Sequence, residues 1–297
     1  MEDFNFDDDV FTASSERKII PLITDYQAKD ETDGWFQDLG DPRQLMLEKL
    51  GPVQFKHAVE HDYLHGRYQQ SLDKALLYID IVETEDQCKV MNTREMVEIA
   101  IHCAARLEDW DQLKQLLDRK QTTYEVGSLL VKGRFYPMCG RSAEAISCLV
   151  EYSKQRKRDY NVWRLMSDAC MMDYSSRPTT GKTMVLHLAH LAIVRAIRIM
   201  TSFNWRMDIP AVKQRYQKEK TCLDQKRDKI EQQGGSVDLF VDWIKSADEK
   251  DRCSVGLDDY SWQDTMWMYR DWAAHLNDTG APLDDDEEEG GQAVKNM

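Results

Sequence analysis

Turn-forming residues are scarce in this 297-residue chain, which has only 14 glycines and 7 prolines. An all-β sandwich or barrel needs a turn signal about every 8–12 residues, and its strands need alternating apolar and polar positions. The chain has too few turn residues for that architecture, and it shows no convincing run of alternation. Its seven cysteines are irregularly spaced without a C-x-x-C pair, which is typical of reduced thiols in a reducing compartment.

Positive charge is also in deficit, with 39 lysines and arginines against 53 acids and a net charge of -14. Phosphate binding needs a basic face, so this balance argues against a nucleic-acid partner. The acidic start, Met1-Glu2-Asp3-Phe4, does not resemble a targeting peptide. No segment approaches the roughly 20 apolar residues of a membrane span, since the most apolar one, residues 184–200, carries His187, His190, Arg195 and Arg198. We therefore expect a cytoplasmic protein with no membrane partner.

Helical periodicity is abundant between residues 41 and 203. Apolar residues recur there every three or four positions, in segments of about 13 residues separated by tight turns such as those at Gly66 and Gly140. The expected helices cover residues 52–64, 68–82, 94–106, 110–119, 126–138, 142–154, a segment starting near residue 160, and 182–201. Short helices joined by tight turns predict an all-α fold of stacked antiparallel pairs that bury one another.

Residues 204–278 are expected to cap this stack. A polar helix over residues 210–233 has a thin apolar stripe and more lysine and arginine than acid, so its basic face is either solvated or docks an acidic partner or the chain's own acidic tail. Two amphipathic helices follow, around residues 239–244 and 258–276, and contain four of the eight tryptophans. An alternative to capping is an interface at Trp262, Trp267 and Trp272, because exposed tryptophans are common binding anchors.

Both ends of the chain are acidic. Residues 1–40 place Asp7-Asp8-Asp9 between Phe6 and Phe11 and predict a flexible segment. An alternative is that Phe4, Phe6, Phe11 or Trp35-Phe36 docks on a partner or on the chain's own groove. Residues 279–297 contain six consecutive acids at 284–289 and predict a disordered tail.

Small and aromatic residues recur at the spacing of a known helical repeat. The third expected pair has Gly133, Tyr136, Gly140, Ala145, Ile146 and Leu149, and the same frame then reaches Trp163 and Ser167. The first pair has Gly66, Tyr68, Ser71, Leu72 and Ala75, and the second has Asp109-Trp110-Asp111. These residues resemble tetratricopeptide repeats, whose frame is about 34 residues.

The resemblance implies a right-handed superhelix of helix pairs with a concave groove for a protein partner. Spacings of 42 residues between Tyr68 and Trp110, and of 32 between Trp110 and Ser142, mark the repeats as degenerate. The order of segments is also similar to a small eukaryotic family whose human member is a chromosome 8 open reading frame protein. This second resemblance lies in Gly34-Trp35-Phe36, residues 66–75, Tyr160-Asn161-Val162-Trp163 and residues 184–200, and implies a repeat fold without an activity.

Three short motifs resemble functional sites that a helical repeat does not require. His57-Ala58-Val59-Glu60-His61 matches the inverted zinc-peptidase pattern, but no further ligand motif follows it. Gly181-Lys182-Thr183 ends like a phosphate-binding loop, yet Ser176 occupies the position of the first glycine. Arg156-Lys157-Arg158 is either a solvated turn or a nuclear import signal. We expect no catalytic residues, metal, cofactor or small-molecule substrate.

The expected function is therefore that of a non-catalytic adaptor or assembly factor that binds one or more proteins in its groove. The repeat frame predicts the groove residues to be Lys56, Glu60, Tyr63, Glu98, His102, Arg106 and Arg134. One alternative is a constitutive structural subunit of a larger complex. A remote alternative is a zinc-dependent hydrolase using His57, Glu60 and His61.

Overall fold

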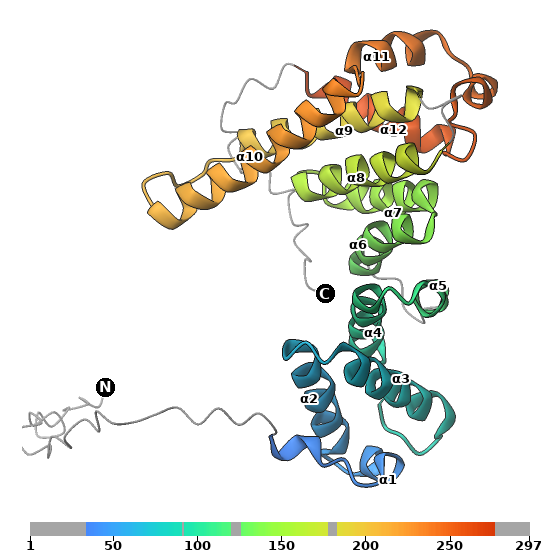
Figure 1. Ribbon diagram of the computed structural model, residues 1–297, viewed down its shortest axis with the longest axis vertical. Coiled ribbons are helices and arrows are strands. Elements are labelled where there is room, and N and C mark those ends of the chain that lie inside the picture. Colours follow the sequence, from blue (N-terminus) through green and yellow to red (C-terminus); the bar gives the residue numbers. More distant parts are fainter. Residues whose placement is uncertain (1–33, 91, 120–125, 178–182, 277–297) are drawn as a thin grey trace, which may run out of the picture.

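The computed structural model describes residues 34–90, 92–119, 126–177 and 183–276. Within these ranges the regular structure is entirely helical, and no strand occurs in them. The helices rise in chain order through an elongated stack, and the last ones gather at its far end (Figure 1). The all-α class predicted from the sequence is confirmed for this part of the chain. Residues 1–33 of the segment predicted to be flexible over 1–40, and the whole tail predicted to be disordered over 279–297, lie outside the described residues. Residues 34–40 are described and include the turn η2, which packs on α2.

The first half of the stack begins with a 3₁₀ turn, η2, that packs on α2. The elements are η2 (Trp35–Gln37), α1 (Pro42–Leu47), α2 (Gly51–Leu64), α3 (Tyr68–Thr84), α4 (Arg94–Leu107) and α5 (Trp110–Asp118). Gly66 lies between α2 and α3 with a φ of 73°, a backbone angle that residues with a β-carbon rarely adopt. Asp109 begins α5 by accepting a 3.0 Å hydrogen bond from the amide of Gln112.

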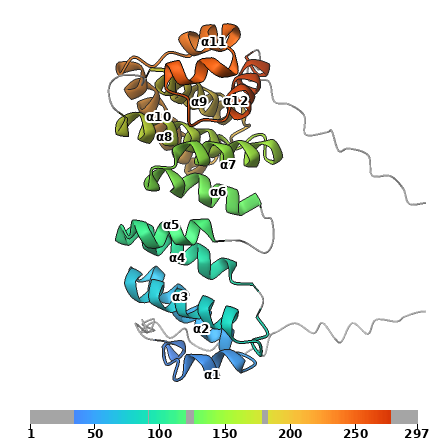
Figure 2. The same ribbon diagram turned by 90° about the vertical axis from the view of Figure 1, so that its right-hand side faces the viewer.

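The second half continues the layers (Figure 2) and ends in α10, α11, η4 and α12. The elements are α6 (Val126–Phe135), η3 (Tyr136–Cys139), α7 (Ser142–Gln155), α8 (Tyr160–Ser176), α9 (Thr183–Ser202), α10 (Pro210–Gln232), α11 (Val237–Ser246), η4 (Glu249–Val255) and α12 (Trp262–Ala274). Of these, α10, α11 and α12 all contact α9. The C-terminal helices therefore cover the last helix of the layered stack.

Two expected helices are shorter than predicted. The helix expected over residues 126–138 ends at Phe135 and continues as the 3₁₀ turn η3, because Pro137 has no amide hydrogen for the next α-helical bond. The helix expected over residues 258–276 starts only at Trp262, where the Ser261 hydroxyl accepts a hydrogen bond from the amide of Asp264. Neither α1 nor η4 was predicted, since both are too short to show a period.

Small residues lie where paired helices touch. The buried Ser71 on α3 donates a 3.0 Å hydrogen bond to the carbonyl of Val59 on α2, and the buried Ser167 on α8 donates one of 2.9 Å to Ala189 on α9. A β-carbon at Gly133 on α6 would meet the side chain of Leu149 on α7 at 2.4 Å. These three positions allow the helix backbones to approach closely.

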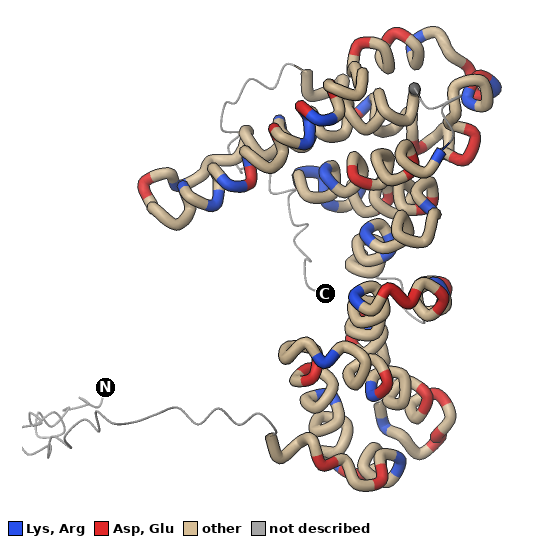
Figure 3. The backbone as a smooth tube through the Cα atoms, viewed as in Figure 1, with Lys and Arg blue, Asp and Glu red and all other residues tan. Residues whose placement is uncertain are grey.

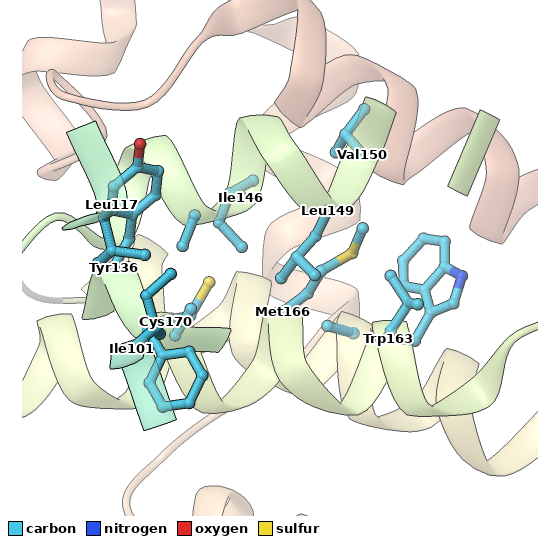
Figure 4. Packing of buried hydrophobic residues seen from close by; sticks show 14 of the residues in the cluster. Ile101, Leu117, Tyr136, Ile146, Leu149, Val150, Trp163, Met166 and Cys170 are labelled. Atoms are coloured by element: carbon cyan, nitrogen blue, oxygen red, sulfur yellow. The ribbon is translucent and has the colours of Figure 1, made fainter. Parts of the chain in front are cut away.

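One apolar cluster runs through every α-helix from α1 to α12, and Phe135 is its buried apolar member on α6. Its middle, shown in Figure 4, joins Ile101 of α4 and Leu117 of α5 to residues of η3, α7 and α8. Trp163 is 1% exposed, stacks on Trp267 of α12 with ring centres 5.8 Å apart, and has the guanidinium of Arg195 over its ring. It therefore links α8, α9 and α12.

Helix α9 corrects one expectation from the sequence. Met184–Ser202 is long and apolar enough to cross a membrane by length and composition alone, whereas no such segment was expected. However, 78% of that window is buried inside the fold. Its apolarity is accounted for by the helices that cover it, because a core helix of a globular fold is apolar on most faces.

We predict that Trp163→Ala lowers the free energy of unfolding by about 3–5 kcal/mol, because it leaves a large cavity among three helices. Trp110→Ala is the matched control, since Trp110 is 40% exposed, and it should cost less than about 1 kcal/mol. Urea denaturation followed by circular dichroism measures both values. Equal losses in the two variants would contradict the central position of Trp163.

Candidate functional site

A large hollow among the described residues lies between four helices that are distant in the sequence. It has a volume of about 1180 Å³ and is lined from α4, α6, α8 and α10. Its apolar lining comprises Leu130, Val131, Phe135, Met138, Leu165, Met171 and Met172. We call this hollow the central groove. Methionines and leucines give it a surface that can adapt to the shape of a bound side chain.

Three cations line the central groove without an acidic partner in the described parts of the chain: Arg134 on α6, Arg164 on α8 and Lys229 on α10. Arg134 is exposed, and its guanidinium lies 5.4 Å from the ring centre of Phe135. The Nε of Arg164 is buried and has no hydrogen-bond partner. These cations are therefore available to carboxylates of a bound segment.

The two acids of the central groove are already engaged. Asp168 accepts a hydrogen bond from the ammonium of Lys226 on α10. Asp159 begins α8 by accepting a 2.9 Å hydrogen bond from the amide of Asn161. Three cations and two carboxylates line the groove, and Lys226 offsets the charge of Asp168. The groove therefore presents a net positive face in a chain whose net charge is -14.

A second hollow of about 960 Å³ adjoins the central groove and shares Leu130 and Asp159 with it. Its wall includes the run Arg156-Lys157-Arg158 at the turn before α8, together with aromatic side chains including Tyr152 and Phe203. The three basic residues are exposed, and no ion pair links them to the described residues. Figure 3 shows the positive charge at this turn and along α10. The basic run thus extends the positive groove and is more than an isolated turn.

Two of the seven predicted groove residues, His102 and Arg134, line the central groove. The other five do not line the central groove. They lie on α2 and α4, and their side chains contact residues of α2, α3 and α4. Lys56 pairs with Glu95 and lies 3.7 Å from Glu60, and Glu98 accepts a 3.0 Å hydrogen bond from Arg94. Arg106 lies over the ring of Tyr68, and Tyr63 contacts that ring and His102.

Sequence reasoning missed the residues on α8 and α10. On α8, residues 161, 164, 165, 168, 171, 172, 175 and 176 line the groove, at the three- and four-residue spacing of one helix face. The opposite face carries the buried residues Trp163, Met166, Ser167 and Cys170. That amphipathic division is visible in the sequence and could have identified the α8 wall, whereas the approach of α10 is a tertiary contact.

His102 lies between two aromatic rings at the α4 end of the groove. Its ring centre is 4.9 Å from that of Phe135 and 6.3 Å from that of Tyr63. Burial lowers the pKa of His102 below its ordinary value, and the nearby positive charge of Arg134 lowers it further. Neutral imidazole is therefore favoured in the folded state.

The residues of the zinc-peptidase pattern hold η2 against α2. The Nδ1 atom of His61 accepts hydrogen bonds from Arg67 at 2.8 Å and Gln37 at 3.0 Å, while Phe36 packs on the His61 ring. His57 Nδ1 lies 3.5 Å from Glu60. Across the described ranges, no group of three or more histidine, cysteine or acidic side chains is placed to hold a metal ion.

The three tryptophans of the possible C-terminal interface face the rest of the fold. Trp267 stacks on Trp163, Trp262 meets Trp243 edge-on with ring centres 6.1 Å apart, and Trp272 is 7% exposed. Packing within the fold therefore explains the positions of the three tryptophans without a partner. Gly181 and Lys182 of the glycine-lysine-threonine motif lie outside the described residues.

Comparisons with known proteins found no relative of this chain. No protein-family model matches the chain, and no curated protein or solved structure was found that is similar to it.

We predict a pH dependence of stability to which His102 contributes. A lowered folded-state pKa means that the unfolded chain takes up protons first, so stability is complete above the unfolded value of about 6.5 and is lost as the pH falls below it. Burial also lowers the pKa values of His187 and His190, which add to the same loss. His102→Gln should therefore reduce, but not abolish, the fall between about pH 7 and pH 5.

Urea denaturation of both proteins across this pH range measures the difference. NMR titration of His102 supplies an independent check, and proton uptake above pH 6.5 would contradict the prediction.

Proposed function

We propose that this chain is a non-catalytic adaptor or assembly factor that binds a partner protein in the central groove. The partner segment would be extended or helical and would carry both acidic and apolar side chains. The observation that carries this proposal is a set of three cations, Arg134, Arg164 and Lys229, that surround an apolar lining and have no acidic partner within the described ranges. In an acidic chain, such a local positive hollow favours a negatively charged ligand.

We further propose that the fold is a degenerate, tetratricopeptide-like right-handed superhelix. The proposal is supported by four consecutive helix pairs, α2–α3, α4–α5, α6–α7 and α8–α9, each of which is in mutual contact. It is also supported by small residues at the repeat positions, because Ser71, Gly133 and Ser167 lie at contacts within pairs. Repeats of this kind bind extended or helical segments along one face of the stack.

The groove's chemistry suggests how such a segment would be held. Apolar side chains would displace water from Leu130, Leu165 and Met171, which supplies most of the affinity. Carboxylates would pair with Arg134, Arg164 and Lys229, which sets the register of the segment and speeds its association. Methionine side chains on both α6–η3 and α8 would allow more than one sequence to fit.

We propose a cytoplasmic location. All seven cysteines are free thiols, and Cys222 and Cys253 are exposed, as expected of a reducing compartment. A nuclear import role for Arg156-Lys157-Arg158 is the alternative, and these side chains line the second hollow beside the central groove.

We predict that reversing the three groove charges, with Arg134→Glu, Arg164→Glu and Lys229→Glu together, reduces partner capture roughly tenfold, because each lost charge contact weakens binding. The matched control reverses three exposed lysines away from the groove, Lys114, Lys245 and Lys250. Quantitative pull-down from cells, followed by crosslinking to locate the bound partner segments, measures the effect. The recovered segments should combine acidic and apolar residues.

Circular dichroism of each variant confirms that it is folded. If the folded groove variant recovers the same proteins as the wild type, the central groove is not the binding site.

A further inference from the structure

The chain itself contains a segment whose chemistry matches the central groove. Phe4-Asn5-Phe6-Asp7-Asp8-Asp9-Val10-Phe11 places three consecutive acids between apolar and aromatic side chains. We propose that these eight residues occupy the central groove of their own chain and compete there with the partner segment. This regulation rests on the proposed function, although occupancy of the groove is a separate property that needs no partner.

Charge is the first point of complementarity. Asp7, Asp8 and Asp9 would supply three carboxylates to a groove in which Arg134, Arg164 and Lys229 have no acidic partner among the described residues. The groove's own acids cannot replace them, because Asp168 is bound by Lys226 and Asp159 caps α8. Three carboxylates beside three guanidinium and ammonium groups form charge-assisted contacts in a partly dry setting.

The apolar side chains are the second point of complementarity. Phe6 and Phe11 flank the acids, and the groove offers Leu130, Leu165 and the thioethers of Met171 and Met172 to receive them. Thioether–aromatic contacts are favourable. The acidic run at residues 284–289 carries charge without any apolar side chain, so it matches the cations of the groove but not their apolar surroundings.

The third point is reach. Phe11 precedes Gly34 by 23 residues, which span up to about 75 Å when extended. The path from α2, on which η2 packs, to α8 runs through the contacts of α3, α4, α5 and η3, which makes five steps, or about 50 Å at 8–10 Å a step. In Figure 1, η2 lies on the side of α2 toward which α10 projects. The segment therefore starts on the correct side of the stack with enough chain to reach the groove.

Site-specific photocrosslinking in the full-length chain tests the proposal. A photoreactive phenylalanine derivative replaces Phe6, the purified protein is irradiated at low concentration, and mass spectrometry maps the linked peptides. We expect links within the same molecule to α6, η3, α8 or the end of α10. The Arg134→Glu, Arg164→Glu, Lys229→Glu variant should lower their yield roughly tenfold, while the Lys114, Lys245, Lys250 control leaves it unchanged.

A charge swap between the segment and the groove shows whether a loss of crosslinks comes from lost charge pairing or from misfolding of the variant. Changing Asp7, Asp8 and Asp9 to lysine should abolish the links in the wild-type groove and restore them in the charge-reversed groove. Links scattered over the surface, or links only between two molecules, would overturn the proposal. So would a yield that does not respond to either set of charges.

The same variants separate this inference from the proposed function. With Phe4, Phe6 and Phe11 changed to alanine, partner capture should rise severalfold, because the competitor is lost. Groove-dependent partner capture without crosslinks would leave the function standing and remove the self-occupancy. Crosslinks in the groove without any captured partner would contradict the proposed function and leave the self-occupancy standing.

Discussion

The structure depends on the close approach of consecutive short helices, none of which can bury enough apolar surface alone. Close approach requires small side chains at the points of contact, and Ser71, Gly133 and Ser167 occupy three of them. The two serines also satisfy their hydroxyls by donating to carbonyls of the opposite helix, so burial leaves no unpaired hydroxyl there. Large apolar side chains such as Trp163 and Leu149 then fill the spaces between layers. The buried charges of Asp62 and Arg195 are paired, with Lys74 and Asp271 respectively.

Local features of the sequence predict most of the helices, because their boundaries follow local chemistry. Gly66 and the Asp109 cap mark ends that the structure confirms. Pro137 also causes the 3₁₀ turn after Phe135, which is a local effect. The helical period continues through residue 138, so the expected helix was extended past Phe135. The helix α1 and the turns η2 and η4 could not be predicted, because elements of three to seven residues show no measurable period.

The candidate site was less predictable than the fold. A repeat frame assigns residues to a concave face only while the repeat length is constant, and the 42-residue spacing after Tyr68 breaks that frame. The prediction selected the early residues Lys56 and Glu60, which lie outside the central groove. Lys56 pairs with Glu95 and lies 3.7 Å from Glu60. Arg134 lies in the regular third repeat, and His102 contacts Phe135 of that repeat, so these two predicted residues do line the groove. Lys229 could not be placed, since nothing local indicates what α10 covers.

The position of α10 follows from the burial of α9. That helix is apolar around most of its circumference, so helices beyond the repeats must cover it, and α10, α11 and α12 do so. Polar contacts fix their register: His190 on α9 lies 3.1 Å from Glu231, and His187 accepts a 3.0 Å hydrogen bond from the amide of Ser236. With α10 held at this end, Lys226 meets Asp168 and Lys229 lines the groove beside α8. The need to cover one apolar helix thus supplies the fourth wall of the central groove and part of its positive charge.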